Sequence, residues 1–438
     1  MHKTCLMTLA VGLMATPALA EDAKSFWDRD TLFGDMGGLR TALADHGLTV
    51  TLTSTDEGFA NAKGGLRRST VYDGMTQVSL KLDTGKAGMW DGGTFAVSAD
   101  QIHGRGPSRF LVGNLQTLST IEAQPSTKLF DLYYEHSLLD GALTLRGGQF
   151  GADEEFLITS YGLNFVNSNF GFPILPASDL PNGGPAYPLA APGLRVKYAP
   201  TDTLTLLAAV FNGNPLAPGG LPQNSPGTDF RTGDGVFAIT ELQYARNQGE
   251  KDTGLPGTYK AGLWYHSGSF ANQNPLPKGA PAFYRGDVSF YGVVDQLLWR
   301  DGDKSGDSAD PAKQRGIGVF ARVMASPDDR NPIDFAASAG LVWIGPLDSR
   351  QSDSLNLGIN YAHVGSRAQS FDAATAAPIR GSETVFEVNY LAQVTGWMQV
   401  QPSIQYVIAP GANVINPNNP RQTLRDAVAF GIRAIVTF

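Results

Sequence analysis

Apolar and polar residues alternate along much of the chain, and the alternation is clearest over residues 427–438. Even positions there carry apolar residues such as Phe430, Ile432 and Phe438, whereas odd positions are small or polar apart from Ile435. A period of two predicts a β-strand whose two faces meet different surroundings. About ten residues of tilted strand can cross a bilayer, so this stretch alone fits a membrane barrel or a soluble sandwich.

The same alternation recurs upstream and favours the barrel. In 382–394, Phe386 and Val388 lie on one face, whereas Glu383 and Glu387 lie on the other. Carboxylates on one face suit a water-filled lumen, and apolar residues on the other suit a lipid-facing wall. We therefore predict an all-β fold, an antiparallel transmembrane β-barrel of about sixteen strands, at about 48–56, 71–83, 93–103, 127–137, 142–150, 192–199, 203–212, 234–246, 258–268, 286–300, 315–325, 335–344, 353–364, 382–394, 397–409 and 427–438.

The connections between these strands differ in length in a regular way. If both termini are periplasmic, connections after even-numbered strands are periplasmic and short, and those after odd-numbered strands are extracellular and long. The connections after the third, fifth and seventh strands are long, at about 103–127, 150–192 and 212–234. Those after the fourth, sixth and fourteenth strands are tight turns. The alternation therefore supports an up-and-down barrel whose long loops face the outside.

The first residues predict export. Lys3 precedes an apolar stretch at 6–15, and Ala18-Leu19-Ala20 forms a small-x-small cleavage motif, so we expect 1–20 to be a signal peptide. The single cysteine would leave with it, which excludes disulfide chemistry in the mature chain. We expect 21–47 to be a periplasmic segment with one short helix and 48–438 to be the barrel domain.

Composition narrows the function classes further. The formal net charge is −8 with no basic patch, so we expect no nucleic-acid partner. The histidines of the predicted strands show no metal-ligand spacing, and Glu154 and Glu155 are adjacent on the chain, so they point apart rather than forming a glycosidase pair. We predict no catalytic residues, no metal and no cofactor.

The connection from about Phe150 to Ala191 is long and rich in aromatic and apolar residues. Long loops in compact folds are usually functional, and this one is too apolar to extend into water. We expect it to fold into the lumen, pack on the barrel wall and narrow the pore.

Several motifs occur in order across the chain: MWDGGTF at 89–95, LYYEHSLLDGALTLRGGQ at 132–149, GGQFGADEEF from Gly147, and DLPNGGPAYPLAAPGLRVKYAPTD from Asp179. In these the chain resembles the carbohydrate-selective porins of the OprB type, most strongly over 26–215. The resemblance implies a monomeric sixteen-stranded barrel in the outer membrane that passes sugars, with inward loops at the constriction.

Sugar passage requires many weak polar contacts, because a polyol must exchange its water hydrogen bonds for wall contacts and then be released. Arginine opposite carboxylate would make an organised narrow point of mixed charge. Candidates come from the two inward loops and from the inward faces of the fifth and sixth strands: Arg105, Arg109, Asp153, Glu154, Glu155, Asn164, Asn167, Asn169, Arg146 and Arg195.

We therefore predict an outer-membrane porin for passive diffusion of mono- and small saccharides in a Gram-negative bacterium. Its partners would be small sugars, outer-membrane lipid and the barrel-assembly machinery, the last contacted through the strand ending in Phe438. Two alternatives stay open at this point. One is a general-diffusion or anion-biased porin; the other is a secreted soluble β-rich protein that binds or acts on carbohydrate.

Overall fold

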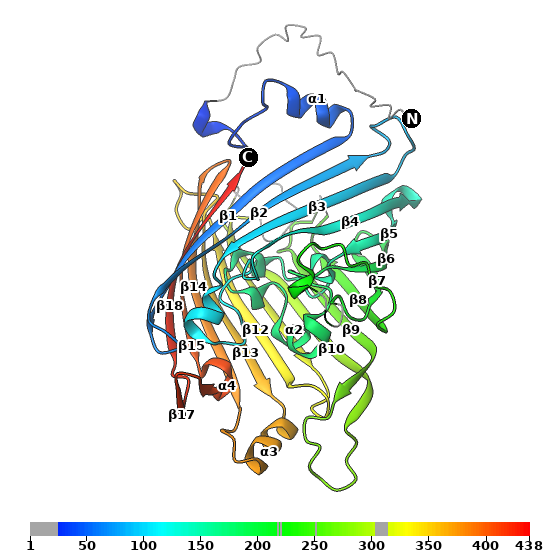
Figure 1. The fold of residues 1–438 in the computed structure, drawn as a ribbon. Coiled ribbons are helices and arrows are strands. Elements are labelled where there is room, and N and C mark those ends of the chain that lie inside the picture. The colour runs from blue at the N-terminus through cyan, green and yellow to red at the C-terminus, as the bar shows by residue number, and fades with distance from the viewer. Residues whose placement is uncertain (1–24, 217–218, 220, 250–251, 303–313) are drawn as a thin grey trace, which may run out of the picture.

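The computed structural model describes residues 25–216, 219, 221–249, 252–302 and 314–438. The expected signal peptide, 1–20, lies outside these residues. Within them, one closed barrel contains sixteen antiparallel strands (Figure 1). These are β1 (Leu48–Lys63), β2 (Thr70–Asp83), β3 (Gly93–Gly104), β4 (Ser126–Leu138), β5 (Leu143–Phe150), β6 (Ala191–Thr201), β7 (Leu204–Asn212), β8 (Val236–Arg246), β9 (Gly257–Ala271), β10 (Phe283–Arg300), β11 (Gly316–Ala325), β12 (Ile333–Ile344), β13 (Ser354–Val364), β14 (Ser382–Thr395), β15 (Met398–Ile408) and β18 (Ala427–Thr437).

Each strand pairs with its neighbours in the chain, and β18 pairs with β1 to close the ring. Closure leaves no strand edge with unpaired backbone groups, which a wall facing lipid requires. All sixteen strands coincide with predicted ones to within a few residues, except that β1 continues seven residues beyond the predicted end at 56. The predicted fold class is confirmed.

Side chains alternate across the wall as the period of two predicts. On β18 Phe430 and Ile432 are 46% and 55% exposed on the outer surface, whereas Arg433 between neighbouring outward positions is buried inside. Large apolar residues are exposed on other strands as well, including Leu194 on β6 and Phe290 on β10. Exposed apolar side chains around a closed barrel are what a lipid-facing wall requires.

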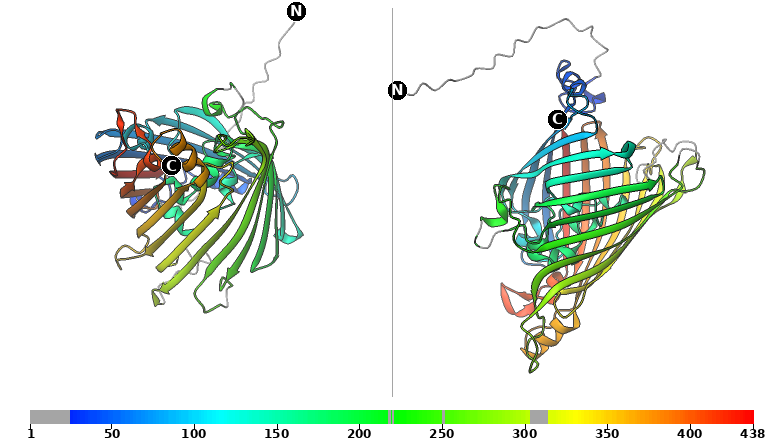
Figure 2. Two further views of the ribbon diagram at one scale, coloured as in Figure 1. Left: turned by 90° about the horizontal axis from the view of Figure 1, so that it is seen from below. Right: turned by 90° about the vertical axis from the view of Figure 1, so that its right-hand side faces the viewer.

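Short elements that the alternation did not reveal lie in the connections. They include α2 (Ile174–Asp179), α3 (Ser366–Ala374), the one-turn helix α4 (Pro410–Asn413) and the small hairpin β16 (Ile415–Asn416) with β17 (Asn419–Thr423). At the opposite end, α1 (Leu39–Asp45) precedes β1 and lies beside the C-terminus (Figure 1). The strands enclose the long connections when the barrel is seen from below (Figure 2).

One expectation about the lumen is wrong. We expected Glu383 and Glu387 of β14 to face water, but both are at most 1% exposed. The side chains point inward as predicted. They are buried because the two inward loops pack over them, and their carboxylates accept hydrogen bonds from the loop backbone.

Candidate functional site

The connection between β5 and β6, residues 151–190, runs across the inside of the barrel, and α2 lies within the ring of strands (Figures 1 and 2). Carboxylates of distant strands accept its backbone N–H groups. Glu241 of β8 accepts from Leu157 at 3.0 Å, and Glu387 of β14 accepts from Val166 and Asn167 at 2.8 Å each. The loop therefore spans from its own strands to the opposite wall.

Basic and amide side chains of the wall bind the carbonyl groups of the same loop. Arg322 of β11, 1% exposed, donates to the carbonyls of Leu157 at 2.8 Å and Gly171 at 2.7 Å, and also to that of Asn169. A buried guanidinium needs such partners, because its donors lose water on burial. With its amides and its carbonyls both bound, the loop is held as a fixed part of the lumen.

The connection between β3 and β4, residues 105–125, packs beside the first loop. Glu383 of β14 accepts from the backbone N–H groups of Leu115 and Gln116 at 2.8 Å each. The two loops also contact each other, because the side-chain amide of Asn167 donates to the Gln116 carbonyl and Tyr187 donates to the carbonyl of Ile121. The loops and the β14 wall thus form one packed body.

A cluster of five charged side chains lies on the other side of the barrel, where the long loop leaves β5. Arg146 of β5 and Arg195 of β6 are register partners across the sheet. Glu135 of β4 accepts from Arg146 at 3.0 Å and from Arg195 at 2.5 Å. From the loop, Glu154 accepts from Arg146 at 2.7 Å, and Glu155 lies 3.2 Å from Arg146 and 2.6 Å from Arg195. We call this set the β4–β6 charge cluster.

The arginines of the cluster are held by the wall, and its acids remain in contact with solvent. The guanidinium carbon of Arg146 lies 4.1 Å from the ring centre of Tyr133, a cation–π contact. The Arg195 guanidinium also donates to the Thr144 hydroxyl at 2.5 Å. The side chains of Glu135, Glu154 and Glu155 are 27%, 28% and 22% exposed. Two guanidinium groups with three carboxylates offer donors and acceptors side by side, and their formal net charge is −1.

Asp153 directly precedes Glu154 in the chain but takes no part in the ion pairs of the cluster. One carboxylate oxygen of Asp153 accepts from the Tyr187 backbone N–H at 2.9 Å, which ties the start of the loop to its end. Burial raises the pKa of this carboxyl to about 7, and the nearby charge of Glu154 adds to the effect. Its charge state therefore changes near neutral pH.

The ten predicted site residues thus fall into three groups. Arg146, Arg195, Glu154 and Glu155 come together in the β4–β6 charge cluster. Asn167 and Asn169 are buried at 0% and 2%, and their amides join the loop to the neighbouring loop. The remaining four are Asp153, Asn164, Arg105 and Arg109. The carbonyl of Asn164 accepts a hydrogen bond from the Gln401 side chain at 2.8 Å. Arg105 and Arg109 are exposed beside Phe110 in the loop after β3.

Sequence reasoning missed Glu135 as a member of the cluster. The signal was present, because Glu135 faces inward on β4 and antiparallel pairing of neighbouring strands places it opposite Arg146. A rule that pairs opposite charges on neighbouring strands would have identified Glu135 from the sequence.

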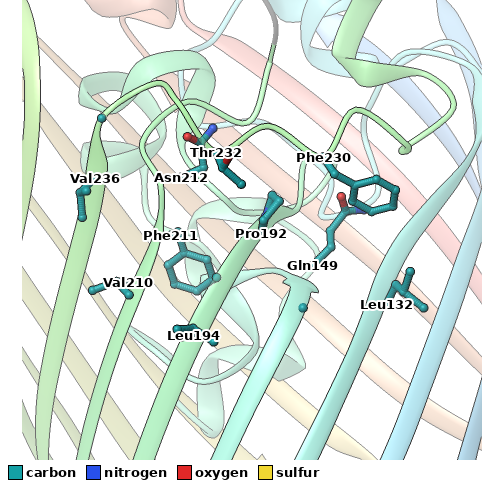
Figure 3. A pocket seen from close by; sticks show the side chains of 13 residues that line it. Leu132, Gln149, Pro192, Leu194, Val210, Phe211, Asn212, Phe230, Thr232 and Val236 are labelled. Atoms are coloured by element: carbon teal, nitrogen blue, oxygen red, sulfur yellow. The ribbon is translucent and has the colours of Figure 1, made fainter.

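One groove of about 770 Å³ lies outside the channel. Its walls include Leu194, Val210 and Val236, which are exposed on the outer surface of the barrel. In Figure 3 Leu194 and Val210 lie lower than Phe230, which belongs to the loop between β7 and β8, and Val236 lies on the opposite side of the view from Phe230. The groove is apolar and opens towards the surroundings of the barrel wall.

The described residues were also considered for helical membrane spans and for metal-binding clusters, because either would change the function class. No helix among them is both long and apolar enough to span a membrane. No group of three or more His, Cys, Asp or Glu side chains in this part of the chain is arranged to hold a metal ion.

Known proteins resemble this chain over nearly its whole length. It is similar to Porin B of Pseudomonas aeruginosa, with 26% identity over 93% of this chain and 92% of that protein. It is also similar to the putative porin QuiX of Acinetobacter baylyi, with 23% identity over 91% of this chain and 94% of that protein.

Solved structures show the same fold. The high-pH structure of Pseudomonas putida OprB superposes with a TM-score of 0.81 at 23% identity, covering 95% of this chain and all of that one. The low-pH structure of the same protein gives a TM-score of 0.59 at 20% identity. Residues 67–438 match the family described as carbohydrate-selective porin, OprB family. The chain therefore belongs to the OprB family of carbohydrate-selective porins, outer-membrane channel proteins of Gram-negative bacteria and transporters rather than enzymes.

Proposed function

We propose that the β4–β6 charge cluster is the sugar-contacting constriction of this porin. The observation that carries the proposal is the difference in exposure between inward-facing acids. Glu135, Glu154 and Glu155 keep solvent contact, whereas Glu241, Glu383 and Glu387 are covered by loop backbone. A passing solute therefore meets the first set and not the second.

The chemistry of the cluster suits a neutral polyol. A sugar hydroxyl both donates and accepts, so adjacent carboxylates and guanidinium groups can bind neighbouring hydroxyls of one ring. Each carboxylate already binds an arginine, so a sugar competes with existing ion pairs and is bound weakly enough to be released. The net charge of −1 argues against the anion-biased alternative.

The measurement is ion current through single channels in planar bilayers, with block by a monosaccharide. We expect Arg146→Gln and Glu155→Gln each to weaken sugar affinity about three- to tenfold, a cost of about 0.7–1.4 kcal/mol. They should shift ion preference in opposite directions, since Arg146→Gln makes the cluster more negative and Glu155→Gln makes it neutral.

Asp328→Asn is the matched control, because Asp328 lies between β11 and β12 and contacts Ser366 and Arg367, away from the cluster. It should keep the parental sugar affinity and ion preference. If both cluster variants fold and also keep the parental values, the constriction lies elsewhere.

The finer statements about location and partners extend the same proposal. We infer that residues 1–20 are a cleaved signal peptide, that the outer wall contacts outer-membrane lipid, and that the strand ending in Phe438 is recognised during assembly. One chain closes the barrel and supplies both inward loops, which supports a functional monomer. Native mass spectrometry of detergent-extracted protein would test both the processed N-terminus and the monomer.

A further inference from the structure

Two buried carboxylates meet one turn of the wall at the extracellular end of the lumen. Asp179 is the last residue of α2 in the long loop, and Asp287 lies near the start of β10. One oxygen of Asp179 accepts from the backbone N–H of Ile333 at 3.2 Å. One oxygen of Asp287 accepts from the Asn331 side-chain amide at 2.8 Å. Asn331 and Ile333 are two residues apart, so both carboxylates converge on the turn between β11 and β12.

The other oxygen of each side chain has no donor. Asp179, Asp287 and Asn331 are 6%, 1% and 0% exposed. The second carboxylate oxygens of Asp179 and Asp287 and the amide oxygen of Asn331 are buried and make no hydrogen bond within the described protein. The amide nitrogen of Asn331 contacts Asp287, so its oxygen belongs to the same cluster. Three buried acceptors without a donor are costly, and each calls for an explanation.

The nearby cation, Arg330, forms its ion pair outside this cluster. Its guanidinium binds the Asp329 carboxylate at 2.7 Å and the Gly286 carbonyl at 2.6 Å. Burial raises the pKa of Asp179 well above its ordinary value, and the charge of Asp287 raises it further.

Two hydroxyl groups add oxygen atoms beside the carboxylates. The hydroxyls of Ser289 on β10 and Ser326 after β11 lie 2.5 Å apart, and the Ser326 hydroxyl lies against Asp179. The carboxylates, the amide and the two hydroxyls named above therefore all present oxygen atoms.

We propose that Asp179, Asp287 and Asn331 form a binding site for a divalent cation, with Ca²⁺ as the ion that suits it best. Ca²⁺ takes carboxylate, amide-carbonyl, hydroxyl and water oxygens in flexible geometry, whereas Mg²⁺ requires a nearly ideal octahedron and retains most of its waters. The site would bind the ion through two carboxylates and one amide oxygen, with ordered water completing its coordination.

The site has a mechanical consequence for the channel. Asp179 belongs to the long inward loop, whereas Asp287 and Asn331 belong to the wall. A cation bound to all three fixes α2 to β10 and to the β11–β12 turn. Ca²⁺ thus stabilises the folded lumen from its extracellular side, independently of whether the β4–β6 charge cluster contacts sugar.

The test is isothermal titration of CaCl₂ into the full-length protein in detergent, after treatment with EDTA. We expect one saturable site with affinity in the range of extracellular calcium modules, about 10⁻⁴–10⁻³ M, and a rise in unfolding temperature on binding. Asp287→Asn and Asp179→Asn should each weaken binding at least tenfold and abolish the rise. Asp328→Asn, which removes a carboxylate from the same β11–β12 connection, should retain both the Ca²⁺ affinity and the rise in unfolding temperature.

Asn331→Asp keeps the test decisive if the other variants fail to fold. A third carboxylate at this position should strengthen Ca²⁺ binding several-fold, because calcium affinity rises with ligand charge. The proposal is overturned if the EDTA-treated parent binds no Ca²⁺ up to about 10 mM, above the range of such modules. It is also overturned if Asn331→Asp and Asp328→Asn bind Ca²⁺ with equal affinity.

Discussion

Two sides of the lumen carry the same residue types and use them in opposite ways. At β4–β6, the Glu135 side chain is 27% exposed and pairs with Arg146 and Arg195. At β14, Glu387 is 1% exposed and accepts two backbone N–H groups from the loop. Both glutamates face inward on an alternating strand. What covers each side chain, and not its direction, decides whether it can meet a solute or instead holds the loop in place.

The inner face of the barrel wall is polar largely because the inward loops need hydrogen-bond partners. A loop folded into a lumen brings backbone groups that lose contact with water, and each needs a partner. Glu241, Asp295, Glu383 and Glu387 supply acceptors, and Arg322 supplies donors. Much of the inward polarity therefore serves the loop, and a smaller part is left for transport.

The largest effect should come from removing the covering loop. Replacing residues 156–188 with a short Gly/Ser link should raise single-channel conductance several-fold and erase discrimination between a monosaccharide and an amino acid of similar size. The reason is that the link uncovers the β14 wall and removes the packed body from the lumen. Conductance and sugar block in planar bilayers measure both effects.

The control for loop removal is the gel mobility of unheated protein, which reports a folded barrel. A folded, loop-deleted protein that keeps the parental conductance and sugar preference would show that this loop does not narrow the channel.

A smaller effect should separate the two glutamate environments by stability. Glu387→Ala leaves the buried N–H groups of Val166 and Asn167 without an acceptor, which costs about 1–3 kcal/mol for each. Glu155→Gln, on the partly exposed side, should change the free energy of unfolding by less than about 1 kcal/mol. Urea unfolding followed by tryptophan fluorescence measures both.

Glu387→Gln provides the intermediate case, because its amide oxygen still accepts one hydrogen bond. The expected order of destabilisation is Glu387→Ala, then Glu387→Gln, then Glu155→Gln. Equal stability of all three would mean that the two walls do not differ in the way described.

The smallest expected effect concerns Asp153 at the start of the loop, where a substitution should change how the stability of the protein depends on pH. The folded-state pKa of Asp153 is raised by burial to about 7, from 3.8. The folded state then binds more protons than the unfolded state between these values, so this group's contribution to stability is lost as pH rises from about 4 to 7. Asp153→Asn should remove that loss and flatten the decline in unfolding temperature between pH 5 and pH 8.

Asp234→Asn is the control of opposite sign. The hydrogen bond from Arg231 lowers the pKa of Asp234, so its contribution is lost only as pH falls through the acid range. This variant should leave the slope between pH 5 and pH 8 unchanged. A parental slope in Asp153→Asn would show that the carboxyl does not titrate in this window.

The alternation of apolar and polar residues was sufficient to predict the wall of this barrel. Alternation over two residues predicted sixteen strands and their inward and outward faces, because side chains on a strand must point to opposite sides. It also located the long connection after β5 and four of the five residues of the β4–β6 charge cluster. The short elements α3 and β16–β17 carry no such period, and they were missed.

Which inward side chains remain accessible depends on packing between distant parts of the chain, which the alternation does not reveal. Glu387 binds residues 166 and 167, more than two hundred positions away along the chain, and no local pattern records that contact. Likewise Asp179 and Asp287 lie in a loop and a strand that meet only when the barrel closes around the loop. The period of a strand predicts which way a side chain points. The charge, partners and exposure of that side chain depend on the parts of the chain that pack against it.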